Sequence, residues 1–282
     1  MSQALESFAA LHPSFDEALA LLTLDLDHGK ANEMGSEQLR EFERLVQDLE
    51  ADSTVRALVS TSTRRSRRGT PIFIAGANVT ERTSWDDDQV KHHVRWQRQV
   101  LGQLRRAPVF HVAVVGGVAL GWGTEYMLTC DYRIAVEGAA FGLPETGLGI
   151  LPGAGGTSEL WAEVGLAHAL RLGMTGERIG PAEACRIGLV QEQAEDLEQG
   201  MARARQLAAL AAKASPTAVS AFKRTVLDAV GLDAEHRTEA EARAYEHCVE
   251  TGQAAIGREH FDAIRKGQGA PWPQRVPWHP NK

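Results

Sequence analysis

The sequence lacks the features that mark several large protein classes. Its 282 residues include only three cysteines, Cys130, Cys185 and Cys248, which are too few and too scattered for a disulfide framework or a zinc cluster. No apolar run reaches the roughly 18 residues of a membrane-spanning helix, and the N-terminal segment lacks a basic start followed by a long apolar core. We therefore expect buried free thiols, no metal, no membrane association and a cytoplasmic protein.

The chain also lacks an excess of positive charge. Its 30 basic and 37 acidic side chains give a net charge of −7. This balance disfavours binding to nucleic acid or to an anionic membrane surface. Small molecules or other proteins are the expected partners.

Several catalytic motifs are missing as well. The glycine-rich run Leu151–Thr157 is not followed by Gly-Lys-Ser/Thr, and no complete G-x-G-x-x-G follows a predicted strand. Neither G-x-S-x-G nor H-E-x-x-H occurs. Nucleotide hydrolysis, dehydrogenation, serine hydrolysis and zinc catalysis therefore lack their central residues.

Hydrophobic periodicity predicts an α/β region followed by a helical one. Short apolar or β-branched runs predict strands, and one-sided apolar patterns predict helices, within a single extended domain. The predicted strands are 20–26, 55–60, 109–115 and 132–136, and the main helices are 36–50 and 88–106. Beyond about residue 158, Ala-, Glu- and Arg-rich periods interrupted by Gly and Pro predict helices only.

Two glutamates stand out in a stretch that is otherwise rich in glycine and apolar residues. Glu125 follows the turn G-W-G-T, and Glu145 ends the segment F-G-L-P-E. A buried carboxylate costs several kcal/mol unless it is paired or hydrogen-bonded, so two of them in such a setting indicate an acid and a base. The alternative is that Glu125 lies on a solvated helix face and Glu145 caps the following turn.

These segments, in this order, resemble the crotonase superfamily, the enoyl-CoA hydratases and isomerases. The family pattern has a glycine-rich turn that opens a helix with one Glu, followed by F-G-x-P-E with the second. Phe73–Asn78 resembles the family's A-G-A-D turn. Residues 28–61 are similar to its first strand exit, helix and second strand, and 172–190 to its T-G-x-x-x-x-A-x-x-A-x-x-x-G-L-V run.

The resemblance implies a fold and an assembly. It implies an α/β spiral of strand-strand-helix turns with a C-terminal helical region that packs into trimers. Residues 1–200 would form the spiral core with an acyl-CoA site, and residues 201–282 a helical trimerisation region of the same structural unit. A homotrimer or a hexamer built as a dimer of trimers is then expected.

The resemblance also implies an activity in acyl-CoA and fatty acid metabolism. Glu125 and Glu145 would act as acid and base, while the backbone N–H groups of Ala77 and Trp122 form an oxyanion hole for the enolate oxygen. This implies an enoyl-CoA hydratase, or a dehydratase in reverse. The alternatives are an isomerase, a lyase or decarboxylase, and a noncatalytic binding protein on the same scaffold. No cofactor is expected, because coenzyme A is part of the substrate.

Further residues are assigned to substrate binding by the same resemblance. They are Lys30, Ala31, Ala75, Gly76, Asn78, Gly121, Pro144 and Gly153. Asn78 and Thr80 replace the Asp and Lys of the family's A-G-A-D-x-K, which puts the usual polar contacts near the CoA entrance in doubt. Trp122 stands where most relatives have glycine, and its ring either shapes the acyl pocket or packs in the core.

A cluster of arginines precedes the A-G-A-N turn. Its members, and a lysine near the C-terminus, are candidates for the CoA phosphates because guanidinium groups match phosphate oxygens. They are Arg64, Arg65, Arg67, Arg68 and Lys266. The simpler alternative is a solvated loop, and an acidic acyl carrier protein is a further candidate partner. We interpret His111 as a hydrogen-bonded core residue and His92 and His93 as solvated residues without a role.

Overall fold

The computed structural model describes residues 8–278, and its centre is a six-stranded sheet. Five of the strands run parallel, and the first pairs antiparallel with the second. In spatial order the strands are β1 (Pro13–Asp16), β2 (Leu21–Asp25), β4 (Ala57–Thr61), β7 (Phe110–Val115), β9 (Tyr132–Val136) and β11 (Glu192–Ala194). The predicted α/β class is confirmed.

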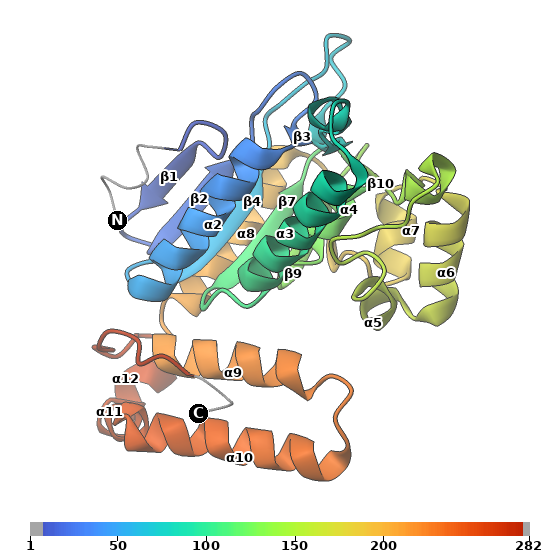
Figure 1. Cartoon of the computed structure of the whole chain (residues 1–282). Coiled ribbons are helices and arrows are strands. Elements are labelled where there is room, and N and C mark those ends of the chain that lie inside the picture. Colours follow the sequence, from blue (N-terminus) through green and yellow to red (C-terminus); the bar gives the residue numbers. More distant parts are fainter. Residues whose placement is uncertain (1–7, 279–282) are drawn as a thin grey trace.

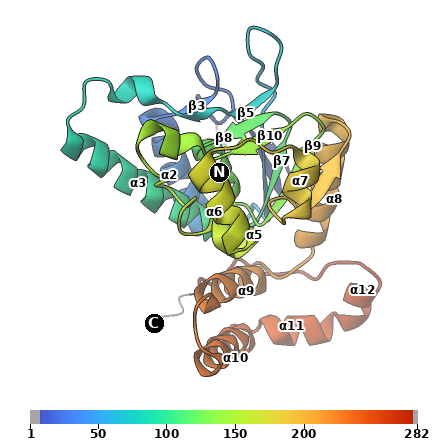
Figure 2. The same ribbon diagram turned by 90° about the vertical axis from the view of Figure 1, so that its right-hand side faces the viewer.

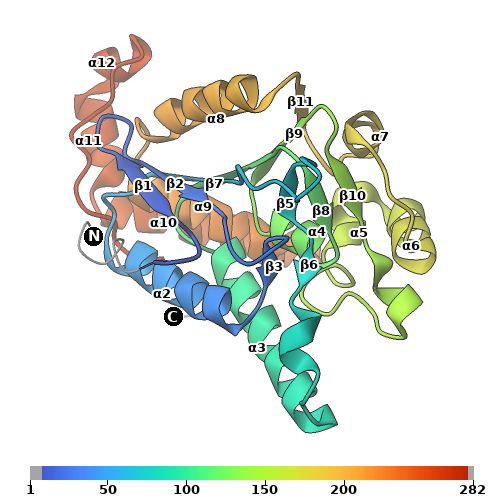
Figure 3. The same ribbon diagram turned by 90° about the horizontal axis from the view of Figure 1, so that it is seen from above.

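Helices cover both faces of this sheet (Figure 3). Since successive side chains of a strand point to opposite faces, Leu22 and Leu58 enter the large core shared with α2 (Ser36–Ala51) and α3 (Asp87–Arg105). Their neighbours Leu21 and Val59 join the smaller core under α8 (Leu197–Ala211). Burial on both faces explains why these strands read as continuous apolar runs.

Shorter strands form a second layer that carries the loops of the site. A parallel three-stranded sheet has the order β10-β8-β5, and β3 pairs with β6 in a separate two-stranded sheet. The elements are β3 (Glu33–Met34), β5 (Ile72–Ile74), β6 (Gly76–Ala77), β8 (Val118–Leu120), β10 (Ala140–Gly142) and the helix α4 (Trp122–Met127). The chain runs β4-β5-α3 and then β7-β8-α4, which gives the expected strand-strand-helix turns.

The C-terminal helices form an arm beside this core (Figures 1 and 2). Between the last spiral turn and the arm lie α5 (Leu160–Val164), α6 (Leu166–Thr175) and α7 (Pro181–Arg186). The arm consists of α9 (Pro216–Ala229), α10 (Ala234–Glu250), α11 (Gln253–Glu259) and α12 (Phe261–Arg265). α8 runs across the expected boundary at residue 200 and packs on the sheet.

A buried lysine fastens the arm to the core. The Nζ of Lys223 on α9 donates to the carbonyl of Val109 at 3.0 Å and to Asp131 Oδ2 at 2.8 Å. The arm exposes large apolar residues: Phe222 and Tyr245 are 72% and 71% exposed. Within the described residues, no helix is both long and apolar enough to cross a bilayer.

The predicted elements agree with the structure to within about two residues at their ends. The predictions of 36–50 and 88–106 correspond to α2 and α3, and 132–136 coincides with β9. The prediction that everything beyond residue 158 is helical was wrong, because β11 adds three residues in parallel to β9. A three-residue strand is too short to produce a recognisable period.

The buried amide of Asn32 determines where the site begins. This residue is fully buried and has a φ of +53°, a conformation that asparagine tolerates better than most residues. Its Nδ2 donates to the carbonyls of Leu26, at 2.8 Å, and of Phe73, and its Oδ1 accepts from the N–H of His28 at 3.2 Å. The loop that leads into β3 is thereby held against the end of β5.

We predict that Asn32→Ala and Asn32→Gly both destabilise the protein by at least about 2 kcal/mol, because the buried carbonyls of Leu26 and Phe73 each lose a donor, although the hydroxyl of Ser62 still donates to that of Leu26 at 2.8 Å. Asn32→Ala should cost about 1 kcal/mol more than Asn32→Gly, since only glycine adopts positive φ freely. The measurement is the free energy of unfolding in urea. A loss below about 0.5 kcal/mol for both variants would show that the amide does not hold this loop.

Candidate active site

The carboxylate of Glu125 is buried and held by backbone donors. Its side chain projects from α4 and the residue is 3% exposed. Oε1 accepts hydrogen bonds from the N–H groups of Ala154, at 2.7 Å, and Gly156, at 3.0 Å. Burial raises the pKa of Glu125 while these two donors oppose the rise. The glycine-rich run 151–157 is therefore a cradle for a carboxylate and not for a phosphate.

Glu145 lies in a different environment. It belongs to the short 3-10 helix η2 (Pro144–Leu148), and its carboxylate packs so closely on Gly121 that a Cβ there would lie 2.5 Å from Oε1. Its Oε2 is sealed from solvent and has no hydrogen-bond partner among the described residues. Burial, helped by the negative charge of Glu125, raises the pKa of Glu145 to about 7.

Two backbone N–H groups belong to segments that adjoin these carboxylates. The N–H of Asn78 donates to the carbonyl of Met34 at 2.7 Å, so alternation along β6 turns the N–H of Ala77 away from β3. Trp122 is the first residue of α4, where an N–H has no partner within the helix. The two segments meet, because a Cβ on Gly76 would lie 3.6 Å from the carbonyl oxygen of Leu120.

Gly121 makes this convergence sterically feasible. Its φ is +52°, a conformation that favours glycine, and its N–H donates to the carbonyl of Gly142 at 2.8 Å. The turn aims the N-terminus of α4 at the space beside Glu145. A separate cavity of about 160 Å³ adjoins Glu125 on the side of α3 and the 154–159 loop, and Gly121, Trp122 and Glu145 do not line it.

The ring of Trp122 packs in the core. It is 2% exposed and stacks on Tyr126, with ring centroids 5.9 Å apart and planes inclined by 24°. Phe42 of α2 lies on it at 6.3 Å. Of the two interpretations left open by the sequence, the structure supports the core, and only the backbone N–H of Trp122 faces the site.

The other residues assigned to substrate binding surround the same region. The carbonyl of Ala31 accepts from the N–H of Ala75 at 3.3 Å, which places Lys30 and Ala31 beside the turn that contains Gly76. Asn78 caps η1 (Val79–Arg82) by accepting from the N–H of Glu81 at 3.3 Å. An amide in place of the family's carboxylate thus serves as a local cap.

The last two residues assigned to substrate binding are Pro144 and Gly153. Pro144 begins η2 and is exposed. The carbonyl of Gly153 accepts a hydrogen bond from Arg98 Nε at 2.9 Å, which links its loop to α3. A Cβ at Gly153 would lie 2.8 Å from Val94 Cγ1, so this contact requires glycine.

The arginine cluster is divided between structural and exposed side chains. Arg64 forms an ion pair with Asp27 at 2.5 Å and donates to the carbonyl of Gly29, so it fixes the loop that carries Lys30. Arg65 donates to the carbonyl of Gly69 at 2.9 Å, and Arg67 and Arg68 are exposed.

Lys266 directly follows α12, and α12 lies in the arm, apart from β3 and α4 (Figure 1). Within residues 8–278, no group of three or more His, Cys, Asp or Glu residues is placed to hold a metal ion.

Sequence reasoning missed two buried polar residues of α3, His93 and Gln97, and the half-buried Arg82. The prediction that His93 is solvated was wrong: it is 5% exposed, with ring centroids 4.9 Å from Trp85 and 5.7 Å from Trp96. His93 and Gln97 continue the buried stripe of α3, and their spacing of four residues could have revealed this. Arg82, at the end of η1, gave no such signal.

The other two histidines interpreted from the sequence, His92 and His111, behave as expected. His92 is exposed. His111 is fully buried and its Nε2 lies 2.8 Å from the hydroxyl of Ser60. It is the hydrogen-bonded core residue that its apolar surroundings predicted.

The fold and this arrangement of carboxylates can now be compared with known proteins. The family model described as enoyl-CoA hydratase/isomerase matches residues 14–270. The chain belongs to this family. It is thus an enzyme of the crotonase superfamily with the acyl-CoA thioester hydratase/isomerase activity of that family.

Individual relatives of this enoyl-CoA hydratase/isomerase cover nearly its whole length. The short-chain-enoyl-CoA hydratase of Clostridium acetobutylicum is 32% identical over 238 residues, which cover 84% of this chain and 89% of that protein. The crystal structure of an enoyl-CoA hydratase from Bacillus anthracis superimposes with a TM-score of 0.82 at 30% identity, over 92% of this chain and 98% of that one. DspI of Pseudomonas aeruginosa gives 0.82 at 29% identity, over 95% and 99%.

In this enoyl-CoA hydratase/isomerase, Trp122→Gly should act on stability and not on substrate choice. Removal of the stacked ring leaves a cavity beside Phe42 and Tyr126, and the expected loss is about 3–5 kcal/mol in the free energy of unfolding. Trp122→Phe should lose less. The ratio of kcat/KM between short and long acyl-CoA esters should stay unchanged in both variants, and a shift of that ratio would contradict the core position.

Proposed function

We propose that the protein is an enoyl-CoA hydratase that adds water across the double bond of a 2-enoyl-CoA thioester. The observation that carries the proposal is the pair of interacting carboxylates, the buried Glu125 and the half-buried Glu145, in segments that adjoin the turns of Ala77 and Trp122. Hydration needs a base for water, an acid for the α carbon and donors for the enolate oxygen. Double-bond migration needs only one proton carrier, so the retention of both glutamates favours hydration.

The different surroundings of the two glutamates assign their roles. Glu125, whose carboxylate accepts two N–H groups, is better stabilised as an anion, and we infer that it takes the proton from the attacking water. Glu145, with a pKa near 7 and an oxygen without a partner, retains a proton near neutral pH. It is the acid that protonates the α carbon.

The backbone donors would stabilise the enolate that forms between these steps. The N–H groups of Ala77 and Trp122 would bind the thioester oxygen as it gains negative charge, and one such donor is typically worth about 3 kcal/mol in the transition state. The N-terminal end of α4 adds its partial positive charge. The hole therefore contributes as much as either carboxylate.

The outer parts of the ligand and the assembly are assigned by the same proposal. The exposed Arg65, Arg67 and Arg68 would meet the phosphates of CoA or an acidic acyl carrier protein, whereas Arg64 shapes the neighbouring loop. The apolar side of the arm would be covered in a trimer or a dimer of trimers. Lys266 would then have to reach CoA from another copy of the chain.

Replacement of either glutamate by glutamine should lower turnover about 10²- to 10⁴-fold, because a positioned acid or base is lost. The assay is incubation with a panel of enoyl-CoA and 3-hydroxyacyl-CoA esters, with products identified by mass. The exposed Glu137→Gln is the matched control and should keep wild-type turnover. Near-normal turnover by Glu125→Gln, with a shifted double bond and no added water in the product, would indicate an isomerase.

Hydration should depend on one proton shared by the two glutamates. Because the pKa of Glu145 is about 7, kcat/KM for hydration should fall about tenfold per pH unit above that value as the last proton leaves. Dehydration should follow the same alkaline limb, since both directions start from the singly protonated pair. Profiles of both directions check this, and a hydration rate that rises above about pH 7 would contradict it.

A further inference from the structure

A buried hydroxyl links the two strands that lead into the candidate active site. Thr124 is the third residue of α4 and is 1% exposed. Its Oγ1 donates to the carbonyl of Ala119 at 2.9 Å and lies 3.0 Å from the carbonyl oxygen of Gly142, so one proton serves two carbonyls. The N–H of Gly142 in turn donates to Oγ1 at 3.3 Å. The side chain of Thr124 therefore joins α4 to both β8 and β10.

These contacts lie close in sequence to the groups assigned to the reaction. Ala119 precedes Trp122 by three residues, and β8 ends between them. Gly142 ends β10 and precedes Glu145 by three residues. Gly121 adds a second link, because its N–H donates to the carbonyl of Gly142 at 2.8 Å. A shift of β10 against α4 would thus change the distance between the N–H of Trp122 and the carboxyl group of Glu145.

The helix itself does not require threonine at this position. In a helix, a threonine hydroxyl typically points to solvent or bonds to a carbonyl of the same helix. β-branched residues also have lower helix propensity, and α4 is only six residues long. The hydroxyl of Thr124 instead leaves the helix and reaches two strands. Its contribution therefore lies in the contact with β8 and β10.

The other side chains of α4 bind different parts of the fold. Glu125 accepts from the glycine-rich loop, and the hydroxyl of Tyr126 lies 2.7 Å from that of Ser60 in β4. Neither of these hydrogen bonds joins α4 to β8 or β10. The ring of Trp122 packs on Phe42 of α2, and apolar contacts of this kind are not directional.

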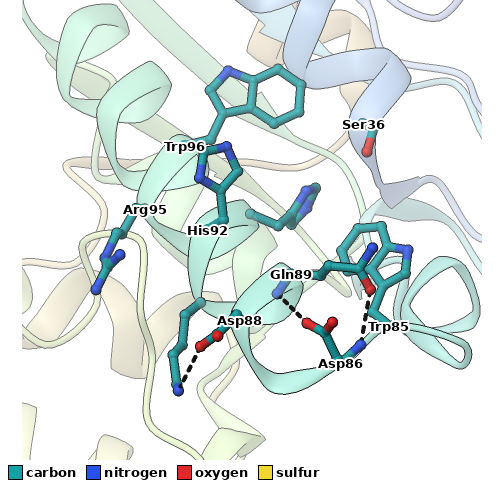
Figure 4. Close-up of a pocket in the computed structure, with 10 residues that line it drawn as sticks. Ser36, Trp85, Asp86, Asp88, Gln89, His92, Arg95 and Trp96 are labelled. Atoms are coloured by element: carbon teal, nitrogen blue, oxygen red, sulfur yellow. Dashed lines mark hydrogen bonds and ion pairs between the residues drawn. The ribbon is translucent and has the colours of Figure 1, made fainter.

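The polar residues at the start of α3 do not provide the link either. His93, Trp85 and Trp96 line a separate cavity of about 1000 Å³ between the start of α2 and the first turns of α3 (Figure 4). None of the residues assigned to the candidate active site lines that cavity. The cavity and the first turn of α4 are therefore held by different parts of the chain.

Close backbone packing holds the same turn of α4 on another side. A Cβ on Gly123 would lie 2.3 Å from the carbonyl oxygen of Ile74, the last residue of β5. Ile74 precedes Ala77 by three residues. Glycine thus lets α4 approach β5, while the hydroxyl of Thr124 sets the place of α4 against β10. Adjacent residues of one turn connect the segments of both N–H groups and of Glu145.

We propose that Thr124 is a positioning residue that holds the N–H of Trp122 at its working distance from the carboxyl group of Glu145. The thioester oxygen has to meet this N–H while the α carbon meets the carboxyl group, so an error in the distance weakens both contacts. A misplacement of about 1 Å in an active site can lower turnover about 100-fold. This inference rests on the proposed function, because it concerns the same oxyanion hole and the same acid.

The first test compares Thr124→Val, which keeps the shape of the side chain, with Thr124→Ser, which keeps the hydroxyl. Thr124→Val should lower kcat for hydration of but-2-enoyl-CoA about 10- to 100-fold and change KM less than about threefold, because the contacts with CoA are untouched. Thr124→Ser should keep kcat within about threefold of the wild type. Thr217→Val is the matched control and should change neither value, since it removes an equally buried hydroxyl from the arm.

The second test reports on the oxyanion hole and needs no turnover. Hydrogen-bond donors on a thioester oxygen lower the infrared stretching frequency of its carbonyl group. Butyryl-CoA with an isotopic label at the carbonyl carbon should show this fall on binding to the wild type and to Thr124→Ser. On binding to Thr124→Val the frequency should fall by less than about half as much, because the donor of Trp122 is displaced.

A wild-type kcat together with a wild-type carbonyl shift in Thr124→Val would overturn the proposal. A lower kcat with a wild-type shift would overturn it too, since the donor would then stand in its normal place. If the wild type itself shows no carbonyl shift, the result counts against the oxyanion hole of the proposed function, and the role of Thr124 falls with it.

Thr124→Ala is the second variant if Thr124→Val does not fold. Alanine is smaller than threonine and favours the helix more, so it removes the hydroxyl without adding strain. It should show the same loss of kcat and of carbonyl shift. Loss of the native fold in both variants, with Thr124→Ser folded, would make the hydroxyl a requirement of the fold and would overturn the positioning role.

Discussion

The burial of a negative charge at Glu125 is the constraint on which the rest of the site depends. A carboxylate that is 3% exposed persists as an anion only with donors, and the N–H groups of Ala154 and Gly156 supply them. The loop that carries these donors must therefore close over α4. Glu145 enters the same space, and the charge already present helps to keep its proton bound.

One short segment, residues 72–82, provides most of the remaining parts. It gives β5 to the second layer, β6 with the donor of Ala77, and the cap Asn78 at the start of η1. These groups are fixed relative to one another because they belong to one short segment of the chain. The amide of Asn32 ties the segment to the loop before β3, so Ala77 and the cap Asn78 share one support.

The sequence predicted those parts of the molecule whose pattern is long or locally encoded. The amphipathic period of α2 and the apolar runs of β2, β4, β7 and β9 located the main sheet, and the Gly-rich turn and F-G-L-P-E located both glutamates. β3, β6 and β11 were missed because two or three residues carry no period. The burial of His93 and the direction of the Trp122 ring depend on which helix faces α3 and α4, which is a property of tertiary packing.

The contact between Gly121 and Glu145 limits how this enzyme can diverge. Gly121 has a positive φ, which disfavours other residues. The carboxylate of Glu145 also occupies the space that a Cβ at residue 121 would need, so any side chain there would displace Glu145. The two positions can therefore change only together, and single substitutions at residue 121 would be purged by selection. In descendants of this chain, the turn before α4 should therefore stay constant.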